Sequence, residues 1–314
     1  MRSARRLPAV LLLAALTLSA CGGGQEPADQ DQGAASPGEG FPVTVEDGTG
    51  EVTIEARPER IVSLSPSSTE MLFEIGAGDQ VVAADEFSNY PEDAPTTDLS
   101  GFTPSVEAVS EYNPDLVIMA RDAEDAAAQL REVDVPVLLI PAAETLDDTY
   151  SQMRMLGEAT GHAQEADEAA DRVESELDAV VQETTEEVGE VDLTYYHELD
   201  DGMYSATSQT FIGQVYERFG LENIADEAED TAGGYPQLSA EFIVDQNPDL
   251  VFLAYEGEDA VADLRGRPAF DSVTAVKNDD IVQLDPDIAS RWGPRVVDLA
   301  ESVSEAVTAA ARER

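Results

Sequence analysis

Short apolar runs alternate with amphipathic stretches over most of the chain. Residues 43–45 and 52–54 alternate apolar and polar side chains around Asp47-Gly48, which predicts a β-hairpin. Compact apolar runs then predict strands at residues 60–64, 81–84, 116–119, 137–140, 193–196, 250–253 and 281–284. Helical spacing predicts helices at residues 106–112, 123–132, 146–160, 163–188, 209–219, 240–246 and 294–311. Strands that alternate with helices in this way indicate parallel pairing within α/β layers.

A further helix is expected directly after the strand at 60–64. Ser65-Pro66-Ser67 opens it. Ser67 with Glu70 fits a capping box, in which the serine hydroxyl and the glutamate carboxylate accept free N–H groups of the first turn. Gly76 and Gly78 are expected to end this helix.

The longest helical pattern lies between two α/β segments. Residues 146–160 are expected to form one helix closed by Gly161, and residues 163–188 a second helix with its apolar residues on one face. At 1.5 Å per residue the second helix runs roughly 38 Å, which makes it a stiff strut. The pattern therefore predicts an N-terminal α/β lobe at 43–145, a helical linker at 146–189 and a C-terminal α/β lobe at 190–314.

An internal repeat links the two halves. Residues 105–117 and 239–251 both read S-x-E, five further residues, and then N-P-D-L-V. The serine is placed to cap a helix, and the glutamate lies in the first turn, where the helix dipole favours a negative charge. One interpretation is a duplicated helix-turn-strand joint with two well-placed caps. The other is that Glu107 and Glu241 present one carboxylate on each lobe to paired arginines of a partner.

Composition restricts the class of partner. The formal net charge is −49, and Lys277 is the only lysine in the 314 residues. Such a surface repels phosphates, which excludes nucleic-acid binding. We interpret the acidity as a solvated surface suited to high salt rather than as a cation site. Because hydrophobic residues make up 42% of the chain, the main body is expected to fold.

Residues 1–21 have the pattern of a secretion signal. Three arginines precede an apolar stretch at 7–18 that is too short to span a bilayer, and small residues then lead to Cys21. This ending resembles the bacterial lipobox, which implies an extracytoplasmic protein anchored to the cell membrane by lipidated Cys21. An ordinary signal peptide with a chance cysteine is the alternative. Residues 22–42 are rich in small and polar residues and are expected to form a flexible tether.

Several motifs lie at the boundaries of the expected elements. They are residues 58–70, Asn89-Tyr90-Pro91, the two N-P-D-L-V joints, residues 235–241 and the R-W-G-P-R stretch at 291–295. Together they resemble the ABC-importer binding proteins for iron-siderophores, haem and cobalamin, over about residues 43–312. The resemblance implies two Rossmann-like lobes joined by a single long α-helix, with limited closure and a ligand cleft between the lobes. It also implies that Glu107 and Glu241 dock on the permease.

The ligand is expected at the carboxyl ends of the parallel strands, where ligands gather in open α/β sheets. Aromatic side chains suit a flat or apolar chelate, and arginines suit its carboxylates or catecholates. The candidate ligand-binding residues are Tyr90, Phe102, Arg121, Tyr204, Tyr235, Arg291 and Trp292, and the loops also offer Ser65, Ser67, Phe87 and His197. A structural role is the alternative for each of them, and His197 fits a satisfied strand-end histidine better than a haem ligand.

Other function classes have weaker support. A free metal-ion carrier usually needs several histidines, and the chain has only His162 and His197. The G-x-S-x-G elbow of a hydrolase is absent, as are G-x-x-x-x-G-K-[ST] and G-x-G-x-x-G. We therefore predict a monomeric, non-enzymatic carrier, without cofactor or metal site of its own, that passes a ferric siderophore or cobalamin to an ABC importer permease. A haem carrier, a free metal-ion carrier and a lipid-anchored α/β hydrolase remain alternatives.

Overall fold

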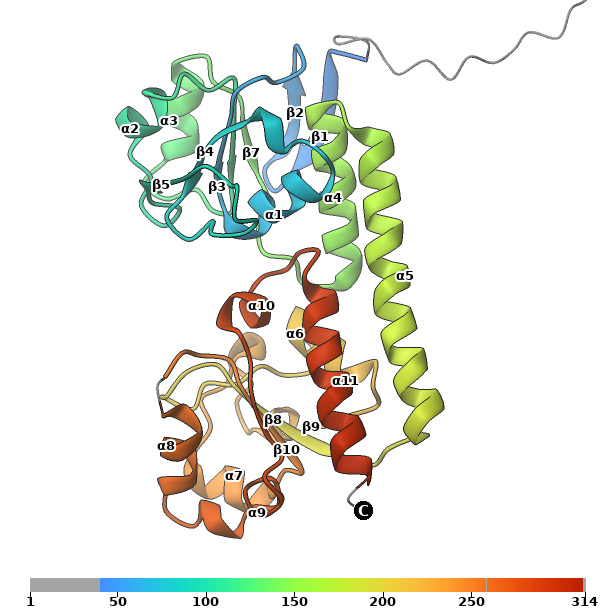
Figure 1. Cartoon of the computed structure of the whole chain (residues 1–314). Helices are drawn as coiled ribbons and strands as arrows, with labels where there is room; N and C mark the ends of the chain where they lie inside the picture. The colour runs from blue at the N-terminus through green and yellow to red at the C-terminus, as the bar shows by residue number, and fades with distance from the viewer. Residues whose placement is uncertain (1–39, 258, 313–314) are drawn as a thin grey trace, which may run out of the picture. The chain divides into compact units, whose positions relative to one another are not determined.

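The computed structural model describes residues 40–257 and 259–312 (Figure 1). The predicted signal segment at 1–21, Cys21 and nearly all of the predicted tether at 22–42 lie outside the described residues. No described helix combines the length and the apolar character that crossing a membrane requires.

A β-hairpin and a five-stranded parallel sheet form the first α/β part. The hairpin pairs β1 (Val43–Asp47) with β2 (Gly50–Ile54) in antiparallel register, as predicted. The strands of the sheet are β3 (Ile61–Leu64), β4 (Val81–Asp85), β5 (Thr96–Leu99), β6 (Leu116–Met119) and β7 (Val137–Leu139). Their order is β5-β4-β3-β6-β7 with every pair parallel, and the connecting helices are α1 (Pro66–Glu74), α2 (Val106–Ser110) and α3 (Ala126–Glu132).

The order of this first sheet creates a switch point. From β3 in the centre, the chain adds β4 and β5 on one side and then β6 and β7 on the other. The loops after β3 and its two neighbours therefore diverge, and open α/β sheets bind ligands in the crevice that such divergence leaves.

A second parallel sheet follows in the C-terminal half. Its strands are β8 (Thr194–Glu198), β9 (Glu222–Asn223), β10 (Leu250–Leu253) and β11 (Ile281–Gln283), in the order β11-β10-β8-β9. Its helices are α6 (Phe211–Glu217), α7 (Ala240–Gln246), α8 (Ala260–Gly266), α9 (Thr274–Asn278), α10 (Pro286–Ser290) and α11 (Val296–Arg312). Two separate parallel sheets with alternating helices confirm the predicted fold class.

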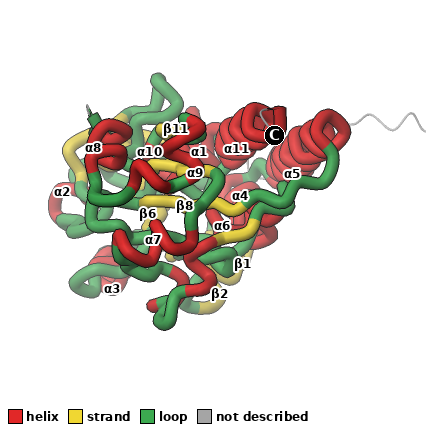
Figure 2. The backbone as a smooth tube through the Cα atoms, turned by 90° about the horizontal axis from the view of Figure 1, so that it is seen from below, coloured by secondary structure: helices red, strands yellow, loops and turns green. Residues whose placement is uncertain are grey.

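Helices α4 (Leu146–Thr160) and α5 (Ala163–Val188) connect the two sheets, as predicted. Thr145 and Asp148 form the capping box that starts α4, and Gly161 ends it with the left-handed φ of 77° that glycine adopts readily. The 26-residue α5 packs against both α4 and α11, and Figure 2 shows α5 and α11 side by side. One apolar core cluster contains residues of both sheets and of α4, α5 and α11, so these helices bind the two α/β parts together.

The internal repeat is a duplicated joint in the structure. Ser105 caps α2 and Ser239 caps α7, because each hydroxyl accepts the backbone N–H three residues further on. Asn113 and Asn247 then take left-handed conformations, with φ of 47° and 52°. Asparagine tolerates this region better than most residues, so it suits the turn between each short helix and the following strand.

The aspartate of each repeat attaches its joint to the sheet. Asp115 accepts a hydrogen bond from the backbone N–H of Arg60 at 2.8 Å, just before β3. Asp249 accepts one from the backbone N–H of Thr194 at 2.9 Å, at the start of β8. The two halves therefore use the same carboxylate-to-backbone contact to place a helix next to the first strand of a sheet.

The predicted capping box at the start of α1 is wrong. Ser65, not Ser67, is the cap, and its hydroxyl accepts the N–H of Ser68 at 3.4 Å. Glu70 is turned inward and pairs with two arginines from the C-terminal half. The sequence also gave no indication of β5, β9 or helices α8 to α10, which are short and have weak apolar periodicity.

Candidate functional site

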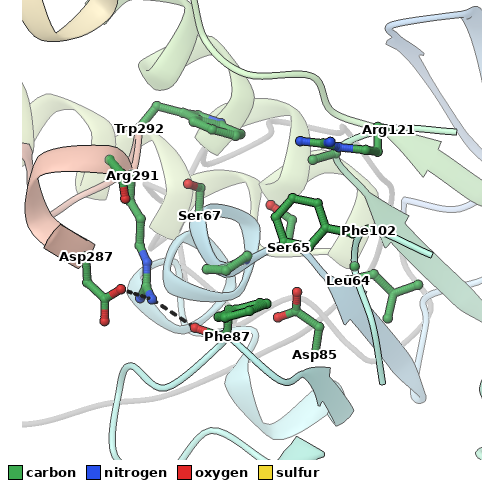
Figure 3. Close-up of a pocket in the computed structure, with 14 residues that line it drawn as sticks. Leu64, Ser65, Ser67, Asp85, Phe87, Phe102, Arg121, Asp287, Arg291 and Trp292 are labelled. Carbon is green, nitrogen blue, oxygen red and sulfur yellow. Dashed lines mark hydrogen bonds and ion pairs between the residues drawn. The ribbon is translucent and has the colours of Figure 1, made fainter. Parts of the chain in front are cut away.

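A pocket of about 350 Å³ lies at the carboxyl ends of β3, β4 and β6, where the switch point predicts it. Residues of the first sheet's loops, of α10 and of the segment that follows α10 share its wall (Figure 3). They are Leu64, Ser65, Pro66, Ser67, Asp85, Phe87, Gly101, Phe102, Ala120 and Arg121 from the first half, with Asp287, Ser290, Arg291 and Trp292 from the second. The pocket is therefore built by residues far apart in the sequence.

Aromatic rings form one wall of the pocket. Phe87 and Phe102 are 49% and 53% exposed and meet edge to face, with 5.8 Å between ring centroids. The Arg121 guanidinium lies 4.8 Å from the Phe102 centroid. Exposed apolar rings that gather at a pocket indicate a binding surface. The cation–π contact leaves both Arg121 and Phe102 exposed, so both remain accessible to a ligand.

Arg121 is the pocket's accessible cation. Its side chain is exposed, and among the described residues it forms no ion pair. Trp292 faces the same space, and its indole Nε1 is buried without a hydrogen-bond partner in the part of the chain that the structure describes (Figure 3). The pocket thus combines apolar surface with an accessible guanidinium, and few polar groups on an apolar lining are usual for a small-molecule site.

Asp85 supplies a buried acid at the pocket. It ends β4 and accepts a hydrogen bond from the Ser88 hydroxyl at 2.5 Å, and Ser88 in turn bonds Thr69 at 2.8 Å. Burial raises the pKa of the Asp85 carboxyl above its usual value of 3.8, and the Ser88 hydrogen bonds and the charge of Arg291 oppose that rise. The side chain is held rigidly, so it can act as a fixed acceptor.

Arg291 lines the pocket but is already engaged. Its guanidinium donates to Glu70 Oε1 at 2.7 Å and to the carbonyl oxygen of Phe87 at 2.8 Å, and it pairs with Asp287 at 2.7 Å. Only 7% of the residue is exposed. Arg291 therefore contributes mainly to the architecture of the wall.

The candidate tyrosines lie outside this pocket. Tyr90 lines a neighbouring groove, where its ring stacks 4.4 Å from the Arg295 guanidinium. Tyr204 and Tyr235 are exposed in the C-terminal half, and Tyr204 forms an isolated bridge with Gln237. Of the predicted ligand-binding set, the structure brings together Phe102, Arg121, Arg291 and Trp292 in one cavity.

His197 is a buried strand residue and does not line the pocket. Its Nδ1 lies 2.8 Å from the Tyr216 hydroxyl, and burial lowers its pKa to about 4, so the ring is neutral. Among the described residues that line the pocket there is no histidine, cysteine or tyrosine. Elsewhere in the described ranges, no cluster of three metal-ligating side chains occurs.

Glu107 and Glu241 occupy equivalent places in the two halves. Each lies in the first turn of its short helix, α2 or α7, and each is exposed. The duplicated joint described above fixes the orientation of both helices relative to their sheets.

Sequence reasoning did not single out Asp85 or Glu70 as site residues. Asp85 had a usable signal, because it follows the predicted strand at 81–84 directly, as the ligand-facing residues of other strands do. Glu70 had none, because its two partners lie more than two hundred residues away.

Two parallel α/β parts, linked by long helices and sharing a pocket, define a two-lobed ligand-binding protein. The sequence matches the family described as Periplasmic binding protein over residues 61–288. The chain belongs to this family.

Relatives with known names extend the match over most of the chain. The chain is 32% identical over 308 residues to the uncharacterized ABC transporter substrate-binding lipoprotein YvrC of Bacillus subtilis, covering 95% of both. It is 31% identical over 300 residues to a cobalamin-binding protein of Halobacterium salinarum, covering 92% of this chain and 80% of that one. Among solved structures, the vitamin B12-binding protein BtuF of Vibrio cholerae superposes with a TM-score of 0.67 at 26% identity, covering 81% and 98% of the two chains.

Proposed function

We propose that this protein captures a corrinoid of the cobalamin type outside the cytoplasm and delivers it to an ABC importer. The observation that carries the proposal is the pocket itself, whose described lining residues offer aromatic surface and the accessible guanidinium of Arg121, and include no histidine, cysteine or tyrosine that could bind iron axially. A corrinoid brings its own cobalt ligands and presents neutral carboxamides around an apolar ring. The cobalamin-binding relative in Halobacterium salinarum supports the same choice.

The charges of the pocket favour a neutral chelate over an anionic one. A ferric catecholate carries several negative charges, and Asp85 and Asp287 would both repel it. Among the described residues that line the pocket, only Arg121 is free to compensate, because Arg291 is paired with Glu70 and Asp287. Carboxamides, in contrast, both donate and accept, so Asp85 can accept from one amide while Arg121 donates to another.

The ligand is larger than the cavity of about 350 Å³. We therefore expect one edge of it to enter between Phe87, Phe102 and Trp292, with the remainder outside. Tyr204 and Tyr235 remain proposed contacts for that outer part, since both are exposed. Tyr90 and Arg291 are proposed to affect ligand binding indirectly, by holding the pocket wall in shape.

Delivery requires a partner on the membrane. Glu107 and Glu241 are proposed to dock on arginines of the importer permease, because each half displays one exposed carboxylate on an equivalent helix. Cys21 is proposed to carry the lipid that anchors a monomeric protein to the outer face of the cell membrane. We propose no catalytic role for the pocket.

A titration panel tests the proposal. Purified protein is titrated with cyanocobalamin, a ferric hydroxamate, a ferric catecholate and haemin, and binding is measured by calorimetry and by the emission of Trp292, the single tryptophan. We expect one cyanocobalamin per chain and no tight binding of haemin or the catecholate. Tight binding of a siderophore without binding of the corrinoid would overturn the proposal. Turnover of p-nitrophenyl esters by the same sample would favour a hydrolase instead.

A further inference from the structure

Glu70 is a buried carboxylate that joins the two halves of the molecule. It lies on α1, is 3% exposed, and is flanked by two arginines from the segment before α11. Arg291 Nη1 donates to its Oε1 at 2.7 Å, while Arg295 donates to Oε1 at 2.6 Å and to Oε2 at 3.0 Å. These three residues are called the Glu70 cluster below.

The same arginines also hold the loop that follows β4. Arg291 donates to the carbonyl oxygen of Phe87 at 2.8 Å, and the Arg295 guanidinium stacks 4.4 Å from the ring of Tyr90. Beside them, Asn89 donates to Asp287 at 2.7 Å. The loop at 87–90 and the segment at 287–295 are thus tied together at three places, from opposite halves of the chain.

Both of these segments carry the pocket wall. Phe87 belongs to the loop, and Trp292 immediately follows Arg291 in the segment. A carboxylate buried with two guanidiniums is costly to separate, because each charge would be left without its partner in a poorly solvated place. Charge-assisted bonds, here bidentate for Arg295, also fix the relative orientation of the groups that they join as well as the distance between them. Glu70 therefore determines how Phe87 and Trp292 face each other before any ligand arrives.

We propose that Glu70 is a positioning residue for ligand capture, which holds the two-part pocket assembled in the absence of ligand. It touches no ligand itself and acts through Arg291 and Arg295. The ligand arm of the test rests on the proposed function, but the assembly of the pocket can be measured without any ligand.

The chain contains a matched control for a merely structural ion pair. Glu198 in β8 is also fully buried, and Arg267 binds it with two bonds of 2.6 Å each. Both partners lie within the C-terminal half, and neither lines the pocket. Glu198 also accepts a hydrogen bond from the Tyr255 hydroxyl at 2.8 Å. Glu70→Gln and Glu198→Gln therefore both remove a buried, arginine-paired charge, but only the first breaks a contact between the halves.

The experiment compares the two variants with the wild-type chain. Thermal melting measures stability, acrylamide quenching of Trp292 without ligand measures the assembly of the pocket, and cyanocobalamin titration measures capture. We expect both variants to melt earlier. Only Glu70→Gln should expose Trp292, seen as stronger quenching and a red-shifted emission. Only Glu70→Gln should weaken capture, by about tenfold if one molecule in ten keeps the pocket assembled.

Wild-type quenching and affinity in Glu70→Gln would overturn the proposal, as would equal losses in Glu198→Gln. If Glu70→Gln does not fold, Arg295→Gln keeps the Arg291–Glu70 bond and should show the same changes to a smaller degree. If the wild-type chain binds no corrinoid, the proposed function fails. The quenching comparison still decides whether Glu70 holds the pocket together.

Discussion

Phe102 offers the most direct test of where the ligand lies. Its ring is 53% exposed and forms the outer part of the aromatic wall. A phenylalanine buries roughly 200 Å² when fully covered, so about 100 Å² of this ring is left for a ligand to cover. At about 25 cal/mol per Å², complete coverage contributes at most about 2.5 kcal/mol, or roughly 60-fold in affinity.

Phe102→Ala should therefore weaken cyanocobalamin binding by up to this factor. The free energy of unfolding should also fall, by up to about 2.5 kcal/mol, because the variant loses the roughly 100 Å² of the side chain that is buried against the protein. Calorimetric titration gives the affinity, and urea unfolding gives the stability. Phe102→Leu, which keeps most of the apolar area, should fall between the wild-type protein and the alanine variant.

Val133 is the control for this comparison. It is a similarly exposed apolar residue, at 56%, and lies at the end of α3 away from the pocket. Val133→Ala should leave both affinity and stability unchanged. An affinity change of less than twofold in Phe102→Ala would refute the placement of the ligand against this wall.

Other consequences of the structure can be measured independently. Arg121→Gln should weaken corrinoid binding about fivefold, the effect of one lost hydrogen bond to a neutral group, whereas a hundredfold loss in calorimetry would indicate an anionic ligand. Replacing Glu107 and Glu241 together with alanine should abolish uptake of labelled cobalamin by cells and leave the affinity of the purified protein intact. Burial raises the pKa of Asp85 above 3.8, so the folded state holds this proton more tightly than the unfolded state does. The contribution of Asp85 to stability therefore falls as the pH rises through the folded pKa. Asp85→Asn should raise the melting temperature at pH 7 and have less effect near pH 4. Burial lowers the pKa of His197 from 6.5 to about 4, so the protein should lose stability as the pH falls through that interval. His197→Gln should remove this loss, so that the melting temperature changes less over the same pH range.

The elements that sequence predicted correctly are those in which burial leaves a direct pattern. Strands β6 and β10 are buried at every position, so each reads as an uninterrupted apolar run, and β3 is equally buried with one serine among its apolar residues. Strand β5 has the sequence TTDL and pairs through its backbone at the edge of its sheet, and β9 has only two residues. Backbone pairing leaves no mark on side-chain polarity, which explains why these strands were missed.

The candidate site was predictable in place but not in detail. Because parallel strands deliver their following loops to the same edge of the sheet, Phe102 and Arg121 were expected near one another, and both line the pocket. Tyr90 follows β4 as well, but its ring points into the neighbouring groove. A position after a strand determines which loop a residue belongs to. It does not determine which way the side chain turns, since that depends on contacts with distant segments.

Glu70 shows how a local rule fails when a distant partner competes. Ser67 and Glu70 have the spacing of a capping box, yet the glutamate pairs with arginines from the other half of the chain. The chain holds 17 cationic side chains against 66 carboxylates, so any arginine near the surface has many acidic neighbours available. Arg291 and Arg295 are instead mostly buried around one carboxylate, which indicates that they have a specific structural role.

The chain's excess of negative charge makes the buried position of the Glu70 cluster more important. Two acidic lobes repel each other at low salt, whereas at about 1 M salt the Debye length falls to about 3 Å and surface charges hardly act on one another. The bonds of the Glu70 cluster are only 2.6 to 3.0 Å long and are shielded from solvent, so salt screens them much less. We therefore expect the contact between the halves to persist from low to high salt, and the affinity for a neutral ligand to vary little over the same range.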